Sequence, residues 1–149
     1  MARILITGMS GAGKTTVLAE LRRRGHMTVD TDYDGWELPD HRWDEPRMAQ
    51  LLASHSDVVV SGTVENQGVF YDRFEYVVLL TAPLRVLLER VGARTNNPYG
   101  GSEADRNEIA GYVQTVEPLL RRGATHELDG RRPTSDLADE LEKLLAHSP

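Results

Sequence analysis

The chain contains 149 residues, of which 40% are hydrophobic and 27% are charged, so it is long enough for one compact domain with a single core. Its formal net charge of −6 argues against a general affinity for nucleic acid, because a polyanionic backbone selects proteins with clustered positive charge. The sequence has no cysteine, which excludes disulfides and thiolate metal sites. It shows neither a signal-peptide pattern nor an apolar run close to the roughly 20 residues that span a bilayer. We therefore expect a cytoplasmic protein that binds neither nucleic acid nor membranes.

A phosphate-binding motif lies near the start of the chain. Residues 8–15 read GMSGAGKT, which matches G-x-x-x-x-G-K-[ST], and they lie between an apolar run at 3–7 and a helical pattern beginning at Thr15. Glycines let successive backbone N–H groups point at a phosphate beside a helix N-terminus. A glycine-rich turn can match this motif by chance, but here the required strand and helix flank it. The nucleotide-binding residues predicted from the loop are Gly8, Gly11, Ala12, Gly13, Lys14, Thr15 and Thr16.

Two carboxylates, Asp30 and Asp32, end the second predicted strand, which follows a helix at 15–24 and covers 26–31. Alternation along a strand puts both on one side, beside the phosphate loop. One can hold Mg²⁺ through water, while the other positions or deprotonates an acceptor hydroxyl. The alternative is that these residues only cap the segment that follows, and Asp34 can replace either of them.

The segment at 33–47 follows the second predicted strand and is called the flap, because the resemblance described below implies that it closes over the acceptor. Its tryptophans, Trp36 and Trp43, can stack on a ring or cover the core. The flap is acidic, with carboxylates at Glu37, Asp40, Asp44 and Glu45. An anionic acceptor would be repelled there unless Arg42 or Arg47 offsets the charge.

A polar stretch follows the third predicted strand, at 57–61, which comes after a helix at 46–54. Ligands in parallel α/β folds bind beyond the carboxyl ends of the strands, so Thr63, Asn66 and Gln67 are candidate acceptor contacts. A simple connecting loop would have a similar composition, and this alternative remains open.

Arginines and a short lid follow the fourth predicted strand, at 76–80. Arg90 and Arg94 close the next helix, and the segment at about 94–104 has turn residues without a hydrophobic period. Guanidinium groups there can neutralise a transferred phosphoryl group, although helix C-terminal arginines are also favoured by the macrodipole.

The last elements complete an alternating pattern. A helical stretch from 102 to 122 should break near Pro118, and a short strand at 125–128 precedes an amphipathic helix at 135–146. Buried strands joined by helices predict a parallel sheet with right-handed crossovers.

The order of these motifs resembles the small P-loop kinases. The chain is most similar to the shikimate kinase and gluconate kinase group and to compact adenylate kinase-like proteins. The resemblance implies a single α/β domain over residues 1–149, a three-layer P-loop NTPase sandwich whose five parallel strands have the order 2-3-1-4-5. It also implies ATP and Mg²⁺, with the metal held by Thr15 and Asp30 and the β- and γ-phosphates by Lys14.

The same resemblance implies roles for the other residues. Asp32 would orient or deprotonate the acceptor, Arg90 and Arg94 would serve the lid, and Arg131 would stack on adenine near residues 129–133. The function expected is ATP-dependent phosphoryl transfer to the hydroxyl of a small-molecule acceptor, by a monomer or small homo-oligomer.

Alternatives and departures concern the acceptor. A nucleoside monophosphate kinase would need paired arginines, for which Arg42, Arg47 and Arg73 are the candidates, and an ATPase or switch would transfer phosphate to water. Shikimate kinases carry a Gly-Gly-Gly-like turn where this chain has Ser61-Gly-Thr63, and their shikimate-binding arginines are not evident here. These departures argue against shikimate as the acceptor.

Overall fold

One parallel sheet organises the computed structural model, which describes residues 2–93 and 102–147. Its strands are β1 (Arg3–Gly8), β2 (Thr28–Asp30), β3 (Val58–Ser61), β4 (Tyr76–Thr81) and β5 (His126–Asp129). They pair in the order β2-β3-β1-β4-β5, and every pairing is parallel. The predicted fold class and strand order are confirmed.

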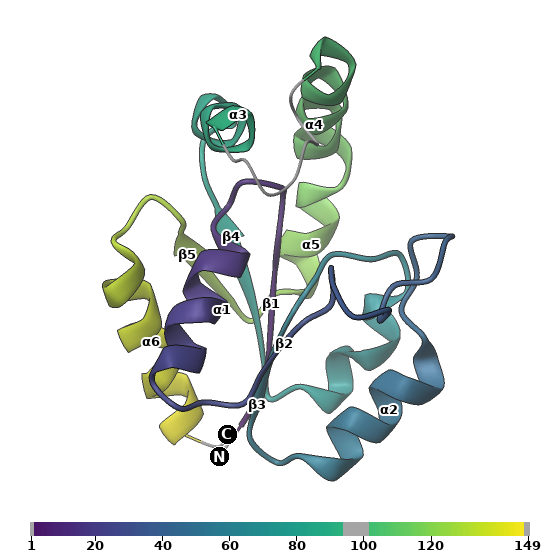
Figure 1. The fold of residues 1–149 in the computed structure, drawn as a ribbon, viewed down its shortest axis with the longest axis vertical. Helices are drawn as coiled ribbons and strands as arrows, with labels where there is room; N and C mark the ends of the chain where they lie inside the picture. Colours follow the sequence, from purple (N-terminus) through teal and green to yellow (C-terminus); the bar gives the residue numbers. More distant parts are fainter. Residues whose placement is uncertain (1, 94–101, 148–149) are drawn as a thin grey trace.

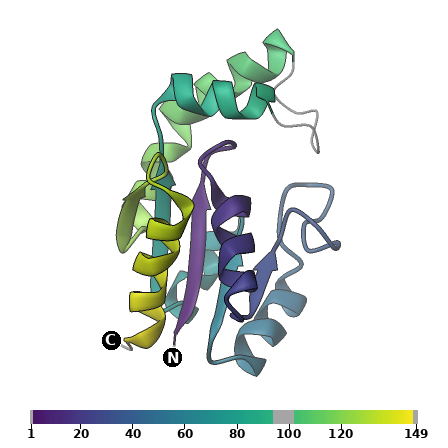
Figure 2. The ribbon, with the colours of Figure 1, turned by 60° about the vertical axis from the view of Figure 1, so that its left-hand side comes forward.

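Helices cover both faces of the sheet (Figure 1). The α-helices are α1 (Lys14–Arg23), α2 (Glu45–Ser54), α3 (Leu84–Ala93), α4 (Glu103–Thr115), α5 (Glu117–Gly123) and α6 (Thr134–Ala146), and η1 (Gln67–Arg73) is a 3₁₀ helix. Figure 1 and Figure 2 show α1 and α6 side by side on one face, with α2 on the other, while α3 and α4 lie beyond the carboxyl edge. This edge is where a ligand of a parallel α/β sheet binds.

Alternation along β1 divides the core into two parts. Ile4 and Ile6 pack on the side of α1 and α6, whereas Leu5 packs on the side of α2 and η1. Each strand residue thus buries its side chain in one of two apolar layers, and the sheet lies between them. Burial on both faces explains why the strands read as continuous apolar runs.

The long helical stretch breaks where the sequence predicts it. Val116 separates α4 from α5, and Pro118 lies in the first turn of α5, where the missing proline N–H costs no helical hydrogen bond. The sequence did not predict η1. Among the described residues, no helix is long and apolar enough to cross a membrane.

Candidate active site

The phosphate loop connects β1 to α1 through three glycines with positive φ. Gly11 and Gly13 have φ of 88° and 107°, in the region that side chains disfavour. A Cβ on Gly11 would lie 2.8 Å from the Leu87 carbonyl oxygen, so this position also requires glycine for space. Gly13 caps α1 without a side-chain hydrogen bond. The N-terminal N–H groups of the helix therefore face the loop, as anion binding requires.

Arg90 fastens the outside of the phosphate loop. Its guanidinium group donates to the carbonyl of Gly11 at 3.2 Å and to that of Gly130 at 2.8 Å. Gly130 packs so closely that a Cβ there would lie 2.3 Å from the Ala12 carbonyl oxygen. The predicted lid arginine thus joins the loop to the turn after β5. Arg94 and residues 94–101 of the predicted lid lie outside the described residues.

Lys14 and Thr63 meet at the centre of the site. The Lys14 ammonium donates to the Gly8 carbonyl and lies 3.3 Å from Thr63 Oγ1. The same hydroxyl donates to the Gly8 carbonyl at 2.8 Å and accepts from the Gly8 N–H at 3.2 Å. Thr63 therefore supports the phosphate loop, a contact that sequence position alone does not reveal.

The side-chain oxygens of Thr15 and Asp30 lie close together beside the first turn of α1. Thr15 Oγ1 donates to Asp30 Oδ2 at 2.9 Å, and Asp30 Oδ1 accepts from the Asp32 N–H at 3.1 Å. Burial raises the pKa of the Asp30 carboxyl above its usual range, and the negative charge of Asp32 adds to this effect. Asp32 lines the cavity described next, whereas Asp30 lies behind it, against Thr15.

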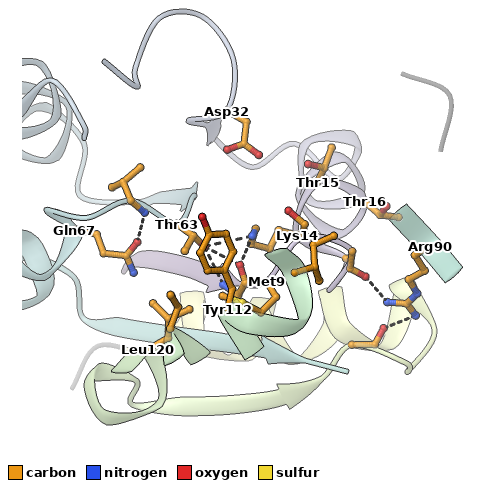
Figure 3. Close-up of a pocket in the computed structure, with 18 of the residues that line it drawn as sticks. Met9, Lys14, Thr15, Thr16, Asp32, Thr63, Gln67, Arg90, Tyr112 and Leu120 are labelled. Atoms are coloured by element: carbon orange, nitrogen blue, oxygen red, sulfur yellow. Dashed lines mark hydrogen bonds between the residues drawn. The ribbon is translucent and has the colours of Figure 1, made fainter. Parts of the chain in front are cut away.

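A cavity of about 1220 Å³ extends from the phosphate loop toward the flap. It exceeds the ~300–1,000 Å³ typical of one small-ligand site, so it has room for more than one small molecule. Figure 3 shows Arg90 and Gln67 toward opposite ends, with Lys14 and Thr63 between them. The cavity thus extends from the phosphate loop, past Lys14, to the loop after β3.

The predicted acceptor residues after β3 separate in space. Gln67 lines the cavity while its amide contacts the Val64 N–H and the Tyr71 hydroxyl, each at 2.8 Å. Asn66 does not line the cavity. Its side chain accepts from the Trp43 N–H at 2.8 Å and donates to the Trp43 carbonyl at 3.1 Å, and so fixes the end of the flap.

Trp43 covers the core. Its indole is 1% exposed and donates to Thr31 Oγ1 at 3.0 Å. A Cβ on Gly62 would lie 2.1 Å from that hydroxyl and 3.3 Å from the indole. The glycine after β3 thus makes room for these two side chains, and not for a substrate.

Around the nucleotide end, the structure places a different arginine in the cavity from the one predicted. Arg131 points to Asp129, 2.8 Å away, and this ion pair lowers the Asp129 pKa to about 2. Arg132, the next residue, lines the cavity together with Gly130 and Thr134. Sequence reasoning missed Arg132 because adjacent arginines in a turn give no signal of which one faces inward.

The sequence analysis also missed one wall of the cavity. Side chains from α4 and α5 line it: Glu108, Ile109, Tyr112, Val116, Leu119 and Leu120. Leu119 is 58% exposed and Tyr112 is 44% exposed, which is unusual for such large apolar groups in a simple connecting helix. The signal for this wall is the exposure of these side chains beside the phosphate loop. That exposure can be recognised only once the fold is known.

A phosphate loop at the carboxyl edge of a sheet ordered β2-β3-β1-β4-β5, with a carboxylate in the same cavity, defines the P-loop phosphotransferases as the class. A family model described as the AAA domain matches residues 4–111. Among known proteins, the shikimate kinase of Aromatoleum aromaticum is 30% identical and aligns over 87% of this chain and 85% of its own length.

Solved structures show the same fold. A shikimate kinase from Acinetobacter baumannii in complex with shikimate superposes with a TM-score of 0.73 at 23% identity, covering 98% of this chain and 93% of that chain. A gluconokinase from Sinorhizobium meliloti gives 0.67 at 20% identity, covering 97% and 91%. The chain belongs to the AAA domain family, and it is a P-loop kinase related to shikimate kinase. It is an ATP-dependent small-molecule kinase.

Proposed function

We propose that this kinase transfers the γ-phosphoryl group of ATP to a hydroxyl of its small-molecule acceptor, with Asp32 as the group that receives the hydroxyl proton. The observation that carries the proposal is that one cavity contains both the phosphate-loop lysine, Lys14, and the Asp32 carboxylate. In the transfer, the acceptor oxygen forms a bond to the γ-phosphorus, the bond to the β,γ-bridging oxygen breaks, and ADP leaves.

In the proposal, the geometry of the phosphate loop determines how the nucleotide is bound. Backbone N–H groups at the start of α1 bind the phosphates, and Lys14 exchanges its contact with the Gly8 carbonyl for the β- and γ-phosphates. Arg90 keeps the loop in shape through its backbone contacts. Arg132 is the cation available to the base and ribose, a role the sequence analysis gave to Arg131.

Mg²⁺ fits the oxygen groups beside α1. The Thr15 hydroxyl and the Asp30 carboxylate, already 2.9 Å apart, are hard donors of the kind that this ion prefers. Within residues 2–93 and 102–147, no group of three or more acidic, histidine or cysteine side chains is placed to hold a metal ion. When bound, the ion neutralises charge on the β- and γ-phosphates.

The acceptor end comprises the flap at 33–47 and the loop after β3. Tyr33, Glu37 and His41 of the flap line the cavity, so this segment contacts the acceptor in the proposal. Gln67 lines the cavity from the opposite side, where its amide is engaged with the Val64 N–H and with the hydroxyls of Thr7 and Tyr71 and so holds this wall in place. Thr63 and Asn66 hold the phosphate loop and the flap, respectively.

The arginines Arg42, Arg47 and Arg73 are not placed to bind the phosphate of a nucleoside monophosphate acceptor. Arg47 stacks on Trp36, with its guanidinium carbon 3.8 Å from the ring centroid. Arg73 lies over the Phe70 ring, and Arg42 lies 3.8 Å from the carboxylate of Asp40. None of these arginines lines the cavity. A hydroxyl that is not accompanied by a phosphate is therefore the better acceptor.

The test measures ADP release with a panel of sugars, polyols, nucleosides, nucleotides and shikimate-like acids. We expect slow turnover with ATP alone and a sharp rise with one class of acceptor. A brisk basal ATPase that no acceptor changes would contradict transfer to a hydroxyl and favour a switch or ATPase.

Matched variants test the role of Asp32. Asp32→Asn should bind ATP normally and lose transfer by ~10²–10⁴-fold, the usual contribution of a general base. Asp34→Asn is the control, because Asp34 does not line the cavity and its φ of 64° suits asparagine equally well. Equal transfer rates for the two variants would remove Asp32 from the mechanism.

A further inference from the structure

Large hydrophobic side chains are exposed along the cavity. Tyr33 is 46% exposed, Tyr112 is 44% exposed and Leu119 is 58% exposed, and all three line the cavity. Leu38 and Val69 are also exposed, and each follows a residue that lines it. Exposed apolar groups that gather in one place mark a surface that binds a ligand or a partner.

Tyr112 and Leu119 belong to one continuous helical face. The Val116 N–H donates to the Tyr112 carbonyl at 2.8 Å and the Leu119 N–H donates to the Val116 carbonyl at 3.0 Å, so hydrogen bonds continue across the break between α4 and α5. Side chains three and four positions apart lie side by side on a helix, which is the spacing of these three residues. Burial raises the pKa of the Tyr112 hydroxyl, and the charge and hydrogen bond of Glu108 raise it further. A neutral ring and two aliphatic side chains therefore form an apolar wall of the cavity.

Contacts through η1 join this apolar wall to the centre of the site. Gly123, at the end of α5, packs so closely on Tyr71 that a Cβ would lie 2.3 Å from its ring. The Tyr71 hydroxyl accepts from the Gln67 amide at 2.8 Å, and the same amide donates to Thr7 Oγ1 at 3.1 Å. Thr7 Oγ1 lies 3.0 Å from Thr63 Oγ1, the hydroxyl that holds the phosphate loop. The apolar wall and the phosphate loop therefore border the same cavity.

Polar side chains at the acceptor end have partners within the protein. Glu37 lies 3.1 Å from His41, and Glu65 lies 3.8 Å from Arg42. The Gln67 amide has the three contacts described above. Each polar group of a ligand that leaves water needs a hydrogen-bond partner in the site. An acceptor with many hydroxyls would have to break these contacts, whereas an apolar group would leave them intact.

We propose that the acceptor is a hydrophobic alcohol, in which the hydroxyl that faces Asp32 is attached to an apolar ring or chain packed on the wall of Tyr112, Val116 and Leu119. This inference rests on the proposed function, since it names the acceptor class for the same transfer. The apolar group takes no part in bond formation. The hydroxyl oxygen receives the γ-phosphoryl group, ADP leaves, and Asp32 receives the hydroxyl proton.

The first test compares acceptors that share a hydroxyl-bearing part and differ in apolar surface: glycerol, its propyl ether and its phenyl ether. Calorimetry in the presence of ADP and Mg²⁺ gives the dissociation constant of each. We expect the phenyl ether to bind at least about tenfold more tightly than glycerol, with the propyl ether between them, because each adds apolar surface that leaves water. Equal or weaker binding of the ethers overturns the inference and leaves the hydroxyl kinase intact. Inorganic phosphate as the only product, with these and with every acceptor of the panel, would instead contradict the proposed function.

Variants of Leu119 then locate the apolar contact. Leu119→Gln keeps a side chain of similar size without its apolar character, and it should weaken binding of the phenyl ether by about threefold to tenfold while ADP binding stays unchanged. Leu119→Met, which remains apolar, should bind the ether as the wild type does. The control is Met27→Gln, at an exposed apolar position outside the cavity.

Two outcomes with Leu119→Gln would overturn the inference. Weakened binding of ADP would assign the apolar wall to the nucleotide. Wild-type affinity for the phenyl ether, in a variant that unfolds at the wild-type temperature, would show that this wall does not bind the acceptor.

Discussion

Replacing Thr63 with valine should destabilise the protein, because its hydroxyl holds the phosphate loop to the loop after β3. Thr63 Oγ1 lies 2.8 Å from the Gly8 carbonyl oxygen, 3.2 Å from the Gly8 nitrogen and 3.0 Å from Thr7 Oγ1. Valine has nearly the same shape, so Thr63→Val removes these contacts while adding little strain.

The expected loss follows from the number of contacts. A hydroxyl has one donor and two acceptor sites, so it can satisfy about three partners at once. Each hydrogen bond contributes a net ~0.5–1.5 kcal/mol, and Thr7, which is fully buried, would retain only its contact with Gln67. We therefore expect the free energy of unfolding to fall by about 2–4 kcal/mol.

Urea unfolding followed by circular dichroism measures this change. Thr63→Ser keeps the hydroxyl and should lose at most about 1 kcal/mol, the contribution of one methyl group. Thr115→Val, an exposed position on α4, should change stability by less than ~0.5 kcal/mol. Wild-type stability for Thr63→Val, with only a raised KM for the acceptor, would refute the supporting role and restore the substrate contact expected from the sequence.

Two further predictions concern carboxylates with shifted pKa values. Hydrogen bonds from Arg23 and Arg24 lower the Glu20 pKa from 4.5 to about 2, so its stabilising contribution is present above pH 4.5 and lost as the pH falls toward 2. Glu20→Gln should therefore flatten the dependence of unfolding temperature on pH in this window, and an unchanged profile would contradict the assignment. Burial raises the Asp30 pKa, so the folded state disfavours the ionised carboxylate, and stability falls as the pH rises through that pKa. Asp30→Asn should raise the unfolding temperature of the nucleotide-free protein at pH 7 while weakening Mg²⁺-dependent transfer, and a lowered unfolding temperature would show that the charge is stabilising.

The elements around the phosphate loop were predictable because they follow local rules. The apolar runs of β1 and β3, the glycine pattern of residues 8–15 and the break before Pro118 each depend on residues adjacent in sequence. The strand order came from resemblance to known kinases, since periodicity alone does not choose among parallel arrangements.

The lining of the cavity was less predictable, because it depends on the direction in which each side chain points and on contacts between residues far apart in sequence. Asn66 and Gln67 are neighbours of the same chemical type, yet one fixes Trp43 and the other faces the cavity. Arg131 pairs with Asp129 and does not line the cavity, whereas Arg132, 3.8 Å from Glu140, does line it. The sequence indicates which polar residues follow each strand, whereas long-range packing determines which of them line the cavity. The residues of the predicted lid, the compartment and the oligomeric state stay predictions.

Phosphorus NMR of the complete reaction tests the central claim most directly. With ATP, Mg²⁺ and a hydroxylated acceptor that stimulates turnover, the account predicts a new phosphomonoester resonance that grows in step with ADP and is absent with Asp32→Asn. Inorganic phosphate as the only new product, in the same amount with and without the acceptor, would contradict it.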